Sequence, residues 1–585
     1  MKSRMRLALL ALAALLICIA ALLLASLRRQ RIEHPLPAPA SAAKRPNVVL
    51  ISLDTVRPDH LGCYGYGRNT SPNLDALARE SVLFKNACAQ APWTLPSHMS
   101  LFTSMLPSHN RVEDLNERLA DDIPTLAELM RAGGYNTVAL VNNGQMMAHW
   151  GFSRGFDVWR EFEADTPAGT CENITREALA WLGARPREPF FLFLHYFDAH
   201  DPYDAPPKYR EAFGSSLSGE EAHAIVWEHR TPGKDIADAR LLKEVIGAYD
   251  AEIAWLDAEL GKLLHALPPE TLIVVFSDHG EAFEEHGWMT HGATLYEEEV
   301  RTALIVRAPG TRARAVEAPV MLLDVAPTVL SLCGLKPEAK HEGRDLTPLL
   351  NGNGNTPDRP ILSETKRHLE GRILKMCARP PWKLIYSLFD ARVELYKLPD
   401  EHTDVAQTEA VRAEEMLSIV RELMAGEDYW MLYAKGDATC EAALKAQGGR
   451  FAVFIPVGFD PERDEFRPSP DGTGLSLRLR QGAGVRGLYF ELSPRDAAVS
   501  FDLKLDGERR REMVFIGGQA NPDAVPFELK NLQHTLPPFN EKPFAPERNG
   551  WHVMRHAGRA AGRSAEGVKL DEDTIKRLRS LGYVR

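Results

Sequence analysis

The stretch Asn-Val-Val-Leu-Ile-Ser-Leu at residues 47–53, followed at once by Asp54 and Thr55, decides the fold class of this chain. A short apolar run without alternation is typical of a parallel strand buried on both faces of a sheet. Similar runs follow at residues 137–141, 189–194, 271–277 and 303–306. Segments with helical spacing lie at residues 71–82, 126–130, 173–182 and 241–267. Strands that alternate with helices predict a doubly wound α/β sheet.

Polar side chains follow these strands at the points where the strands end. Asp54 follows the first, Asn142 the second, and Asp278 with His279 the fourth, while His200 lies just beyond the third. Ligands of doubly wound sheets bind outside the carboxyl ends of the strands. One such residue would be chance, but several together predict a functional site at that edge.

The segment Ala-Pro-Trp-Thr-Leu-Pro-Ser-His at residues 91–98 precedes another apolar helical face, and Pro107 closes it. We expect Thr94 just before the start of this helix, where backbone N–H groups and the helix dipole favour negative charge. A hydroxyl that must become an alkoxide would benefit from that position. Taken alone, the segment is better explained as a polar cap on a core helix.

Bulk properties place the chain among large globular proteins. Its 585 residues are 44% hydrophobic and 25% charged, with a formal net charge of −11, which indicates no nucleic-acid partner. The seven cysteines form neither a metal-type cluster nor a C-x-x-C pair, so a disulfide framework is not indicated.

The N-terminus predicts a membrane anchor. Residues 7–27 form an uncharged apolar run, and a bilayer-spanning helix needs about 20 such residues. Basic residues flank the run on both sides, and no small-x-small cleavage site follows it closely. Residues 35–43, rich in Pro and Ala, are expected to be a spacer. These features predict a retained anchor with an extracytoplasmic (periplasmic or extracellular) body.

The remaining chain divides by composition. We expect an anchor and linker at 1–45, a catalytic domain at 46–350, a C-terminal subdomain at 351–425, and a β-rich extension at 426–585. The break at 352–360 is rich in Gly, Asn and Pro. Short strands are predicted at 373–377, 383–387 and 393–397 in the subdomain, and at 451–456, 475–479, 498–503 and 513–516 in the extension, which a helix at 570–581 closes.

Asp54, Asp278 and His279 are the kinds of ligand that hold a divalent cation. Such an ion lowers the pKa of a bound hydroxyl, which makes Thr94 a candidate nucleophile. His200 and His291 are candidates for general acid or anion clamp, because imidazole titrates nearest neutrality.

Four segments resemble the sulfatase family of the alkaline phosphatase superfamily: 47–65, 72–78, Ser-Asp-His-Gly-Glu at 277–281, and His-Gly-Ala-Thr-Leu-Tyr-Glu-Glu at 291–298. The resemblance runs from about residue 46 to 405 and includes Trp-Lys-Leu-Ile at 382–385 and Glu-Leu-Tyr-Lys-Leu at 394–398. It implies a central mixed sheet flanked by helices, a small C-terminal antiparallel sheet, and one divalent metal (Ca, Mg, Mn or Zn) beside an ester-cleaving nucleophile.

By position, the resemblance implies that Asp54, Asp278 and His279 bind the metal. Thr55 stands where many sulfatases carry a second metal aspartate, and Thr94 occupies the nucleophile position, also next to the metal.

The resemblance also assigns roles around the substrate. Asn142 falls where many sulfatases have a sulfate-binding lysine. His200 matches a histidine near the leaving group, and His291 lies where a lysine or histidine clamps the ester anion.

The chain departs from the family at its nucleophile. Sulfatases carry Cys/Ser-x-Pro-Ser-Arg, whose first residue is oxidised to formylglycine, whereas this chain has Thr94 first and His98 in place of the arginine. Oxidation of a threonine alcohol would give a ketone. Threonine resembles the nucleophile of nucleotide pyrophosphatase/phosphodiesterases and lipoteichoic-acid-synthase-like phosphotransferases.

Three interpretations follow. The preferred one is a metal-dependent hydrolase or transferase of phosphate or phosphonate esters through Thr94. The second is a sulfatase that works without formylglycine, and the third is a non-catalytic, membrane-tethered binding module. The expected substrate is an anionic ester of a small molecule, glycan or lipid headgroup, and the oligomeric state is left open.

Overall fold

The computed structural model describes residues 45–115, 117–142, 145–162, 170–230, 234–354, 359–367, 372–388, 392–424, 429–457, 463–480, 485–493, 497–510, 513–516, 519–520, 527–529, 549–556 and 566–567. The predicted membrane span at 7–27 and the predicted closing helix at 570–581 lie outside these residues. No helix in the described ranges combines the length and apolarity that crossing a bilayer requires. Within them, six cysteines are free.

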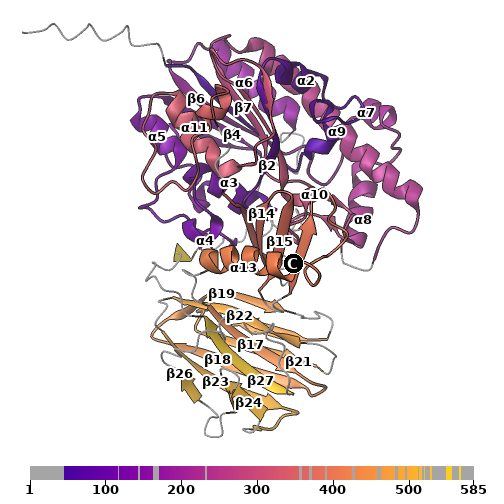
Figure 1. The fold of residues 1–585 in the computed structure, drawn as a ribbon, viewed down its shortest axis with the longest axis vertical. Helices are drawn as coiled ribbons and strands as arrows, with labels where there is room; N and C mark the ends of the chain where they lie inside the picture. Colours follow the sequence, from indigo (N-terminus) through magenta and orange to yellow (C-terminus); the bar gives the residue numbers. More distant parts are fainter. Residues whose placement is uncertain are drawn as a thin grey trace, which may run out of the picture. The chain divides into compact units, whose positions relative to one another are not determined.

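A mixed sheet forms the centre of the catalytic domain (Figure 1), in the order β11-β2-β10-β7-β1-β6-β4-β5, with β12 beside β2. β1, β4, β5, β6 and β7 run parallel, and β10 pairs antiparallel with β7 and β2. The expected mixed α/β sheet is therefore confirmed. The strands are β1 Val48–Leu53, β2 Val82–Cys88, β4 Asn136–Val141, β5 Val158–Glu161, β6 Phe190–Tyr196, β7 Leu272–Ser277, β10 Arg301–Arg307, β11 Arg314–Val316 and β12 Val320–Met321.

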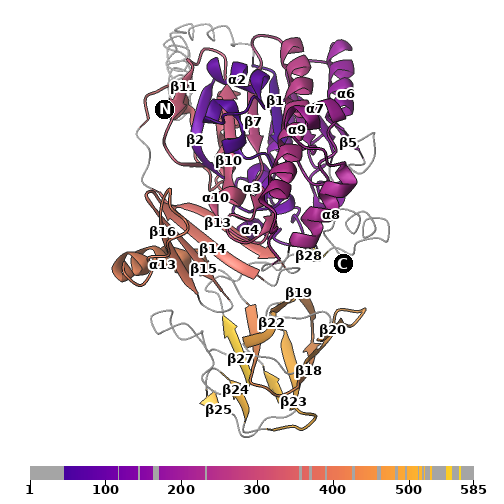
Figure 2. The ribbon, with the colours of Figure 1, turned by 90° about the vertical axis from the view of Figure 1, so that its right-hand side faces the viewer.

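Helices cover both faces of this sheet because each strand buries alternate side chains on opposite sides. In β1, Val48 and Leu50 join one apolar core, and Val49 and Ile51 join the other. The first core contains α3 Thr94–Thr103, α5 Leu126–Ala132 and α11 Val325–Leu332; the second contains α2 Pro72–Arg79, α6 Cys171–Gly183, α8 Gly219–His229 and α9 Ala239–Ala266. Figure 2 shows α6 and α9 side by side.

Short elements complete the domain around this framework. They are β3 Glu117–Arg118, β8 Ala282–Phe283, β9 Met289–Thr290, α4 Pro107–Asn110, α7 Pro207–Ala212, α10 Glu297–Val300 and α12 Thr347–Leu350. Pro107 begins α4, because its fixed φ and missing N–H suit a first helical position.

Two local predictions need correction. The helix expected at 71–82 ends at Arg79, and Val82 is instead the first residue of β2. Strand β2 lacks the uniform apolar pattern of β1, since Lys85 and Asn86 interrupt it, so it was missed. Thr94 is the first helical residue of α3 and not the residue before it, with Trp93 as N-cap.

The sheet of the C-terminal subdomain is antiparallel, as expected. The subdomain sheet has the order β13-β14-β15-β16 and packs against α13 Ala410–Met424. Its strands are β13 Ile361–Arg367, β14 Arg372–Arg379, β15 Trp382–Ser387 and β16 Val393–Lys397.

The extension forms two further sheets, ordered β19-β22-β17-β27-β24-β25 and β20-β21-β18-β23-β26, around a shared apolar core. Their strands are β17 Tyr429–Lys435, β18 Cys440–Gln447, β19 Arg450–Val457, β20 Glu465–Pro468, β21 Gly474–Leu479, β22 Val485–Ser493, β23 Ala498–Leu505, β24 Val514–Ile516, β25 Gln519–Ala520, β26 Phe527–Leu529 and β27 Gly550–His556; β28 Glu566–Gly567 pairs instead with β3.

Candidate active site and metal centre

Asp54 and Asp278 meet because β1 and β7 are parallel neighbours in register. Leu53 pairs with Ser277, so the next residue of each strand emerges at the same edge of the sheet. Both carboxylates are fully buried. Burial, together with the neighbouring charge of Asp54, raises the pKa of Asp278 well above its usual range. Two buried carboxylates in this arrangement favour a cation between them.

His279 completes the candidate ligand set. Its Nε2 lies 3.3 Å from Oδ2 of Asp278 and 3.5 Å from Oδ1 of Asp54. Its Nδ1 lies 2.9 Å from the carbonyl oxygen of Gly280. An N–H at Nδ1 donates to that carbonyl, which leaves the Nε2 lone pair directed at the carboxylates. The donor set therefore fits a divalent metal.

Thr55 lies in the turn directly after β1, next to Asp54. Its backbone N–H donates to Oδ1 of Asp278 at 3.2 Å, whereas its hydroxyl donates to the carbonyl oxygen of Asp54 at 2.8 Å. Its φ of +57° is uncommon for a β-branched residue and costs about 1–3 kcal/mol. The hydroxyl of Thr55 is thus occupied by the backbone, and the residue shapes the turn that carries Asp54.

Thr94 lies at the N-terminus of α3, and its side chain contacts the candidate metal ligands Asp54 and His279. Its hydroxyl oxygen is 3.4 Å from Oδ2 of Asp54 and 3.3 Å from Nε2 of His279. The residue is fully buried. Oε1 of Gln145 accepts the N–H of Leu95, one of the first backbone donors of the helix. A hydroxyl in this position is suited to activation by a metal that the neighbouring side chains would hold.

His98 lies one turn further into α3, behind Thr94. Its Nδ1 is 2.9 Å from the carbonyl oxygen of Thr94, and its Nε2 is 2.8 Å from Oγ of Ser52. Burial lowers its pKa to about 3, so the position held by arginine in sulfatases carries a neutral imidazole at pH 7.

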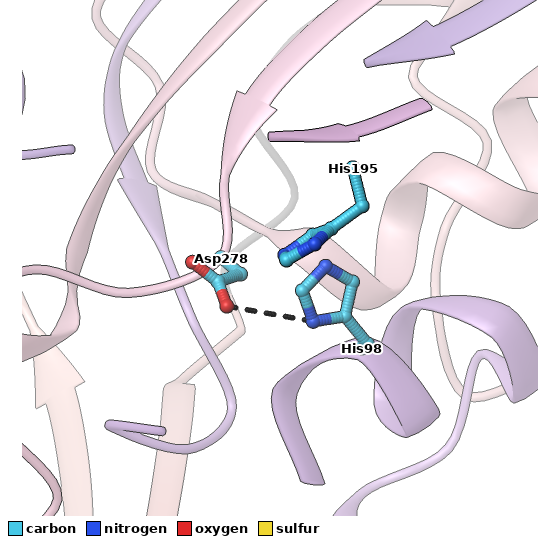
Figure 3. Close-up of side chains that lie close together, drawn as sticks. All are labelled: His98, His195 and Asp278. Atoms are coloured by element: carbon cyan, nitrogen blue, oxygen red, sulfur yellow. Dashed lines mark ion pairs between the residues drawn. The ribbon is translucent and has the colours of Figure 1, made fainter. Parts of the chain in front are cut away.

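His195, Ser52 and Glu281 are site residues that sequence reasoning missed. Nε2 of His195 lies 3.2 Å from Oδ2 of Asp54, and Figure 3 shows its ring beside that of His98. The available signal was a polar residue inside an otherwise apolar strand: β1 and β6 place Ser52 opposite His195. Burial lowers the pKa of His195 to about 3.

His200 and His291 lie next to the candidate metal ligands. The ring of His291 is 4.5 Å from that of His279 and 4.9 Å from that of His200. Nδ1 of His291 is 3.0 Å from Oε1 of Glu281. Burial and the neighbouring His291 lower the pKa of His200 to about 4.

Asn142 follows β4 at the same edge of the sheet and is fully buried. Neither atom of its side-chain amide has a hydrogen-bond partner among the described residues. An unsatisfied buried amide is costly, so it is suited to bind polar atoms of a substrate.

Comparison with known proteins decides the family. A family model described as Sulfatase matches residues 46–335, and one described as N-sulphoglucosamine sulphohydrolase, C-terminal, matches residues 284–427. The chain belongs to the sulfatase family.

Relatives of this sulfatase-family chain include a delta 4,5-hexuronate-2-O-sulfatase of Bacteroides thetaiotaomicron, 24% identical over 69% of this chain and 94% of that protein. A choline-sulfatase of Rhizobium meliloti is 25% identical over 70% of this chain and 91% of that protein. The phosphonate monoester hydrolase of Agrobacterium radiobacter shares the fold, with a TM-score of 0.55 and 23% identity over 65% of this chain and 95% of that one. The chain is therefore an ester-bond hydrolase, which argues against a non-catalytic module.

Proposed function

We propose that this sulfatase-family hydrolase cleaves phosphate or phosphonate esters, with Thr94 as the nucleophile and a divalent metal held by Asp54, Asp278 and His279. The observation that carries the proposal is the position of the Thr94 hydroxyl, buried at the start of α3 and within 3.4 Å of both Asp54 and His279. A phosphorylated or phosphonylated threonine can be cleared by in-line attack of water, whereas a threonine sulfate lacks the elimination route of a formylglycine hydrate.

Zinc is one divalent metal that fits the donor spacing; calcium, with bonds of about 2.3–2.6 Å, fits it as well. The distances among the donor atoms of Asp54, Asp278, His279 and Thr94 are 3.3–3.5 Å where the structure gives them. Zinc bonds of about 2.0–2.1 Å in tetrahedral geometry separate ligand atoms by about 3.3–3.4 Å. Octahedral magnesium, with bonds of similar length, would bring them to about 2.9–3.0 Å. When bound, the ion would polarise the ester and favour the ionised form of the hydroxyl.

The chain's own residues account for the two displacement steps. The Thr94 oxygen attacks phosphorus as its proton passes to Oδ2 of Asp54, and the bond from phosphorus to the leaving oxygen breaks. A protonated His200 donates its proton to that oxygen. In the second displacement, water attacks phosphorus as it gives a proton to the now neutral His200. The bond to Thr94 breaks, and the threonine oxygen takes back its proton from Asp54.

The remaining polar groups hold the anion. Nδ2 of Asn142 is an unpartnered donor among the described residues and is suited to a non-bridging oxygen of the ester. His291, hydrogen-bonded through Nδ1 to Glu281, is oriented to present Nε2 to the same anion. An anionic ester favours the protonated form of His200, because opposite charge raises the pKa of an imidazole.

The assay that tests this proposal compares three substrates. The full-length chain, loaded with zinc, should turn over an aryl phosphodiester and an aryl phosphonate monoester faster than an aryl sulfate of the same leaving group. The sulfate preference of the named relatives is the second candidate function, and a higher kcat/KM for the sulfate would favour it. In either case the proposed substrates are anionic esters of small molecules, glycans or lipid headgroups.

We also propose that residues 7–27 anchor the enzyme with its catalytic domain on the extracytoplasmic side of a membrane. The apolar run and its flanking basic residues support this placement. Protease accessibility of the catalytic domain in intact cells tests it, and protection by the inner membrane would contradict it.

A further inference from the structure

An exposed aromatic side chain lies on α8, the helix that follows the candidate leaving-group histidine in the chain. Trp227 is 38% exposed, and among the residues that the structure describes the other exposed large hydrophobic side chains are Val158 and Val411. Tryptophan has a large apolar ring that is usually covered by protein or by a ligand. An exposed indole near a site is therefore a candidate contact for a ligand.

Trp227 belongs to a row of three side chains along one side of α8, which we call the α8 row. His223, Trp227 and Arg230 follow one another at helical spacing, so they lie on one side of the helix. The ring of His223 is 5.6 Å from that of Trp227, and the guanidinium of Arg230 stacks over the indole at 3.4 Å. Ala222 and Val226 bury the neighbouring side of α8 in the second apolar core. The row is thus held in place by the packing of the helix beneath it.

Asp201 connects the α8 row to the candidate active site. Its Oδ2 lies 2.5 Å from Nδ1 of His223, and its carbonyl oxygen lies 2.6 Å from Nδ1 of His200. Helix α8 also lies against β9, and His291 follows the last residue of β9 directly. The α8 row therefore begins beside the two histidines that would meet the ester.

The groups of the α8 row complement a sugar ring. An indole offers a flat apolar surface to the C–H groups on one face of a pyranose. A guanidinium stacked on that indole keeps its N–H groups at the rim, where they can donate to hydroxyls. Nε2 of His223 adds a polar atom on the side opposite the bond to Asp201. An alkyl group would match the indole but none of the polar groups around it.

We propose that the α8 row binds the leaving alcohol of the ester, and that this alcohol is a pyranose of a glycan whose ring stacks on Trp227. The inference rests on the proposed function, because His200 is the group that would protonate the departing oxygen. It narrows the substrate to a sugar ester among the anionic esters considered above.

Kinetics on two esters of one phosphonic acid tests the α8 row. One ester carries methyl glucopyranoside as the leaving alcohol and the other carries ethanol. Trp227→Ala should raise KM for the sugar ester about tenfold and leave kcat unchanged, because it removes binding and not chemistry. KM for the ethyl ester should not change. An equal effect on both esters, or none on the sugar ester, would overturn the proposal.

Two further variants sharpen this comparison. Trp227→Phe keeps an aromatic ring and should retain most of the affinity for the sugar ester. Val411→Ala is the matched control, since it removes an exposed apolar side chain from a different helix, α13, and should alter neither KM. A rise in KM for the sugar ester in Val411→Ala equal to that in Trp227→Ala would contradict a specific contact.

Saturation-transfer NMR tests the same contact without turnover. The full chain is mixed with methyl glucopyranoside or with nitrophenol as an aryl probe. We expect transfer to the C–H protons of the sugar in the wild type and its loss in Trp227→Ala. Transfer to nitrophenol but not to the sugar would overturn the assignment to a glycan. A chain that binds the sugar through Trp227 but turns over neither ester would contradict the proposed function and leave the sugar site standing.

Discussion

The hydroxyl oxygen of Thr94 lies 3.3 Å from Nε2 of His279, although 185 positions separate the two residues in the chain. The contact exists because α3 begins at the edge of the sheet where β7 ends. At that point the Thr94 hydroxyl meets both the positive end of a helix and the candidate metal ligands.

Replacement of Thr94, the proposed nucleophile, should abolish turnover. We expect Thr94→Ala to lower kcat/KM by roughly 10³-fold or more, the scale of loss that follows removal of a nucleophile. Thr94→Ser keeps the hydroxyl and should retain most of the activity. Steady-state kinetics on the aryl phosphodiester measures both. Sulfate turnover that survives in Thr94→Ala would contradict the mechanism.

Metal binding should stabilise the fold through Asp278. Zinc at about 100 times its Kd adds about 2.7 kcal/mol to the free energy of unfolding. We expect the thermal unfolding midpoint of the wild-type chain to rise accordingly, as measured by calorimetry.

Asp278→Asn provides the matched comparison. It removes the charge that Asp54 opposes, so the metal-free variant should be at least as stable as the metal-free wild type. It should also gain little from zinc. A zinc-dependent rise equal to that of the wild type would place the metal elsewhere.

Glu299 should give the fold a pH dependence. It is fully buried and accepts the N–H of Gly292 at 2.6 Å, next to His291, and burial raises its pKa to about 8. The folded state therefore holds a proton that the unfolded state releases near pH 4.5. This contribution is complete at low pH and is lost as pH rises from about 4.5 through 8.

Glu299→Gln removes this titration while keeping the shape of the side chain. The difference in unfolding midpoint between the variant and the wild type, measured from pH 5 to 9, should shift in favour of the variant as pH rises. A constant difference across that range would show that Glu299 is ionised in the folded protein.

A buried ion cluster should bind the extension to the rest of the chain. The carboxylate of Glu491 in β22 accepts hydrogen bonds from the guanidinium of Arg111 at 2.8 Å and from the hydroxyl of Tyr489 at 2.6 Å. It also forms an ion pair with Lys366 of β13. Removal of one partner from a buried pair costs about 3–5 kcal/mol, because the other charge is left uncompensated. Glu491→Gln should therefore lower the free energy of unfolding by about that amount.

An exposed pair supplies the control for Glu491. Asp502 and Arg509 form two contacts of 2.7 Å near the surface. Asp502→Asn should change stability by at most about 1 kcal/mol. Denaturant titration of both variants makes the comparison, and equal effects would show that the cluster at Glu491 is not a structural link.

The sequence predicted the parts of the site that follow the ends of buried strands. Asp54, Asp278 and His279 could be named because a long apolar run stops abruptly before each of them. His195 was passed over although it directly follows the apolar run at 189–194. The strand β6 continues to Tyr196, and the register of β1 and β6 shows His195 to be a site residue. The direction of a side chain could not be predicted from the sequence either. The hydroxyl of Thr55, for example, donates to the carbonyl oxygen of Asp54.

The fold could likewise be predicted only in part from the sequence. The apolar runs in the sequence predicted the parallel strands. Strand β2 was not predicted, because it follows α2 after only two residues and no Gly or Pro marks its start. Its edge partners, β11 and β12, have three and two residues and leave too short a pattern to identify.

The most direct test of the account is to trap the covalent intermediate. The zinc-loaded chain is mixed with the aryl phosphonate monoester or phosphodiester, quenched in acid within the first turnovers, and digested for peptide mass spectrometry. We predict one phosphoryl or phosphonyl group on Thr94 and none in Thr94→Ala. A chain that turns over substrate while Thr94 stays unmodified, or that carries the group on another residue, would contradict the central claim.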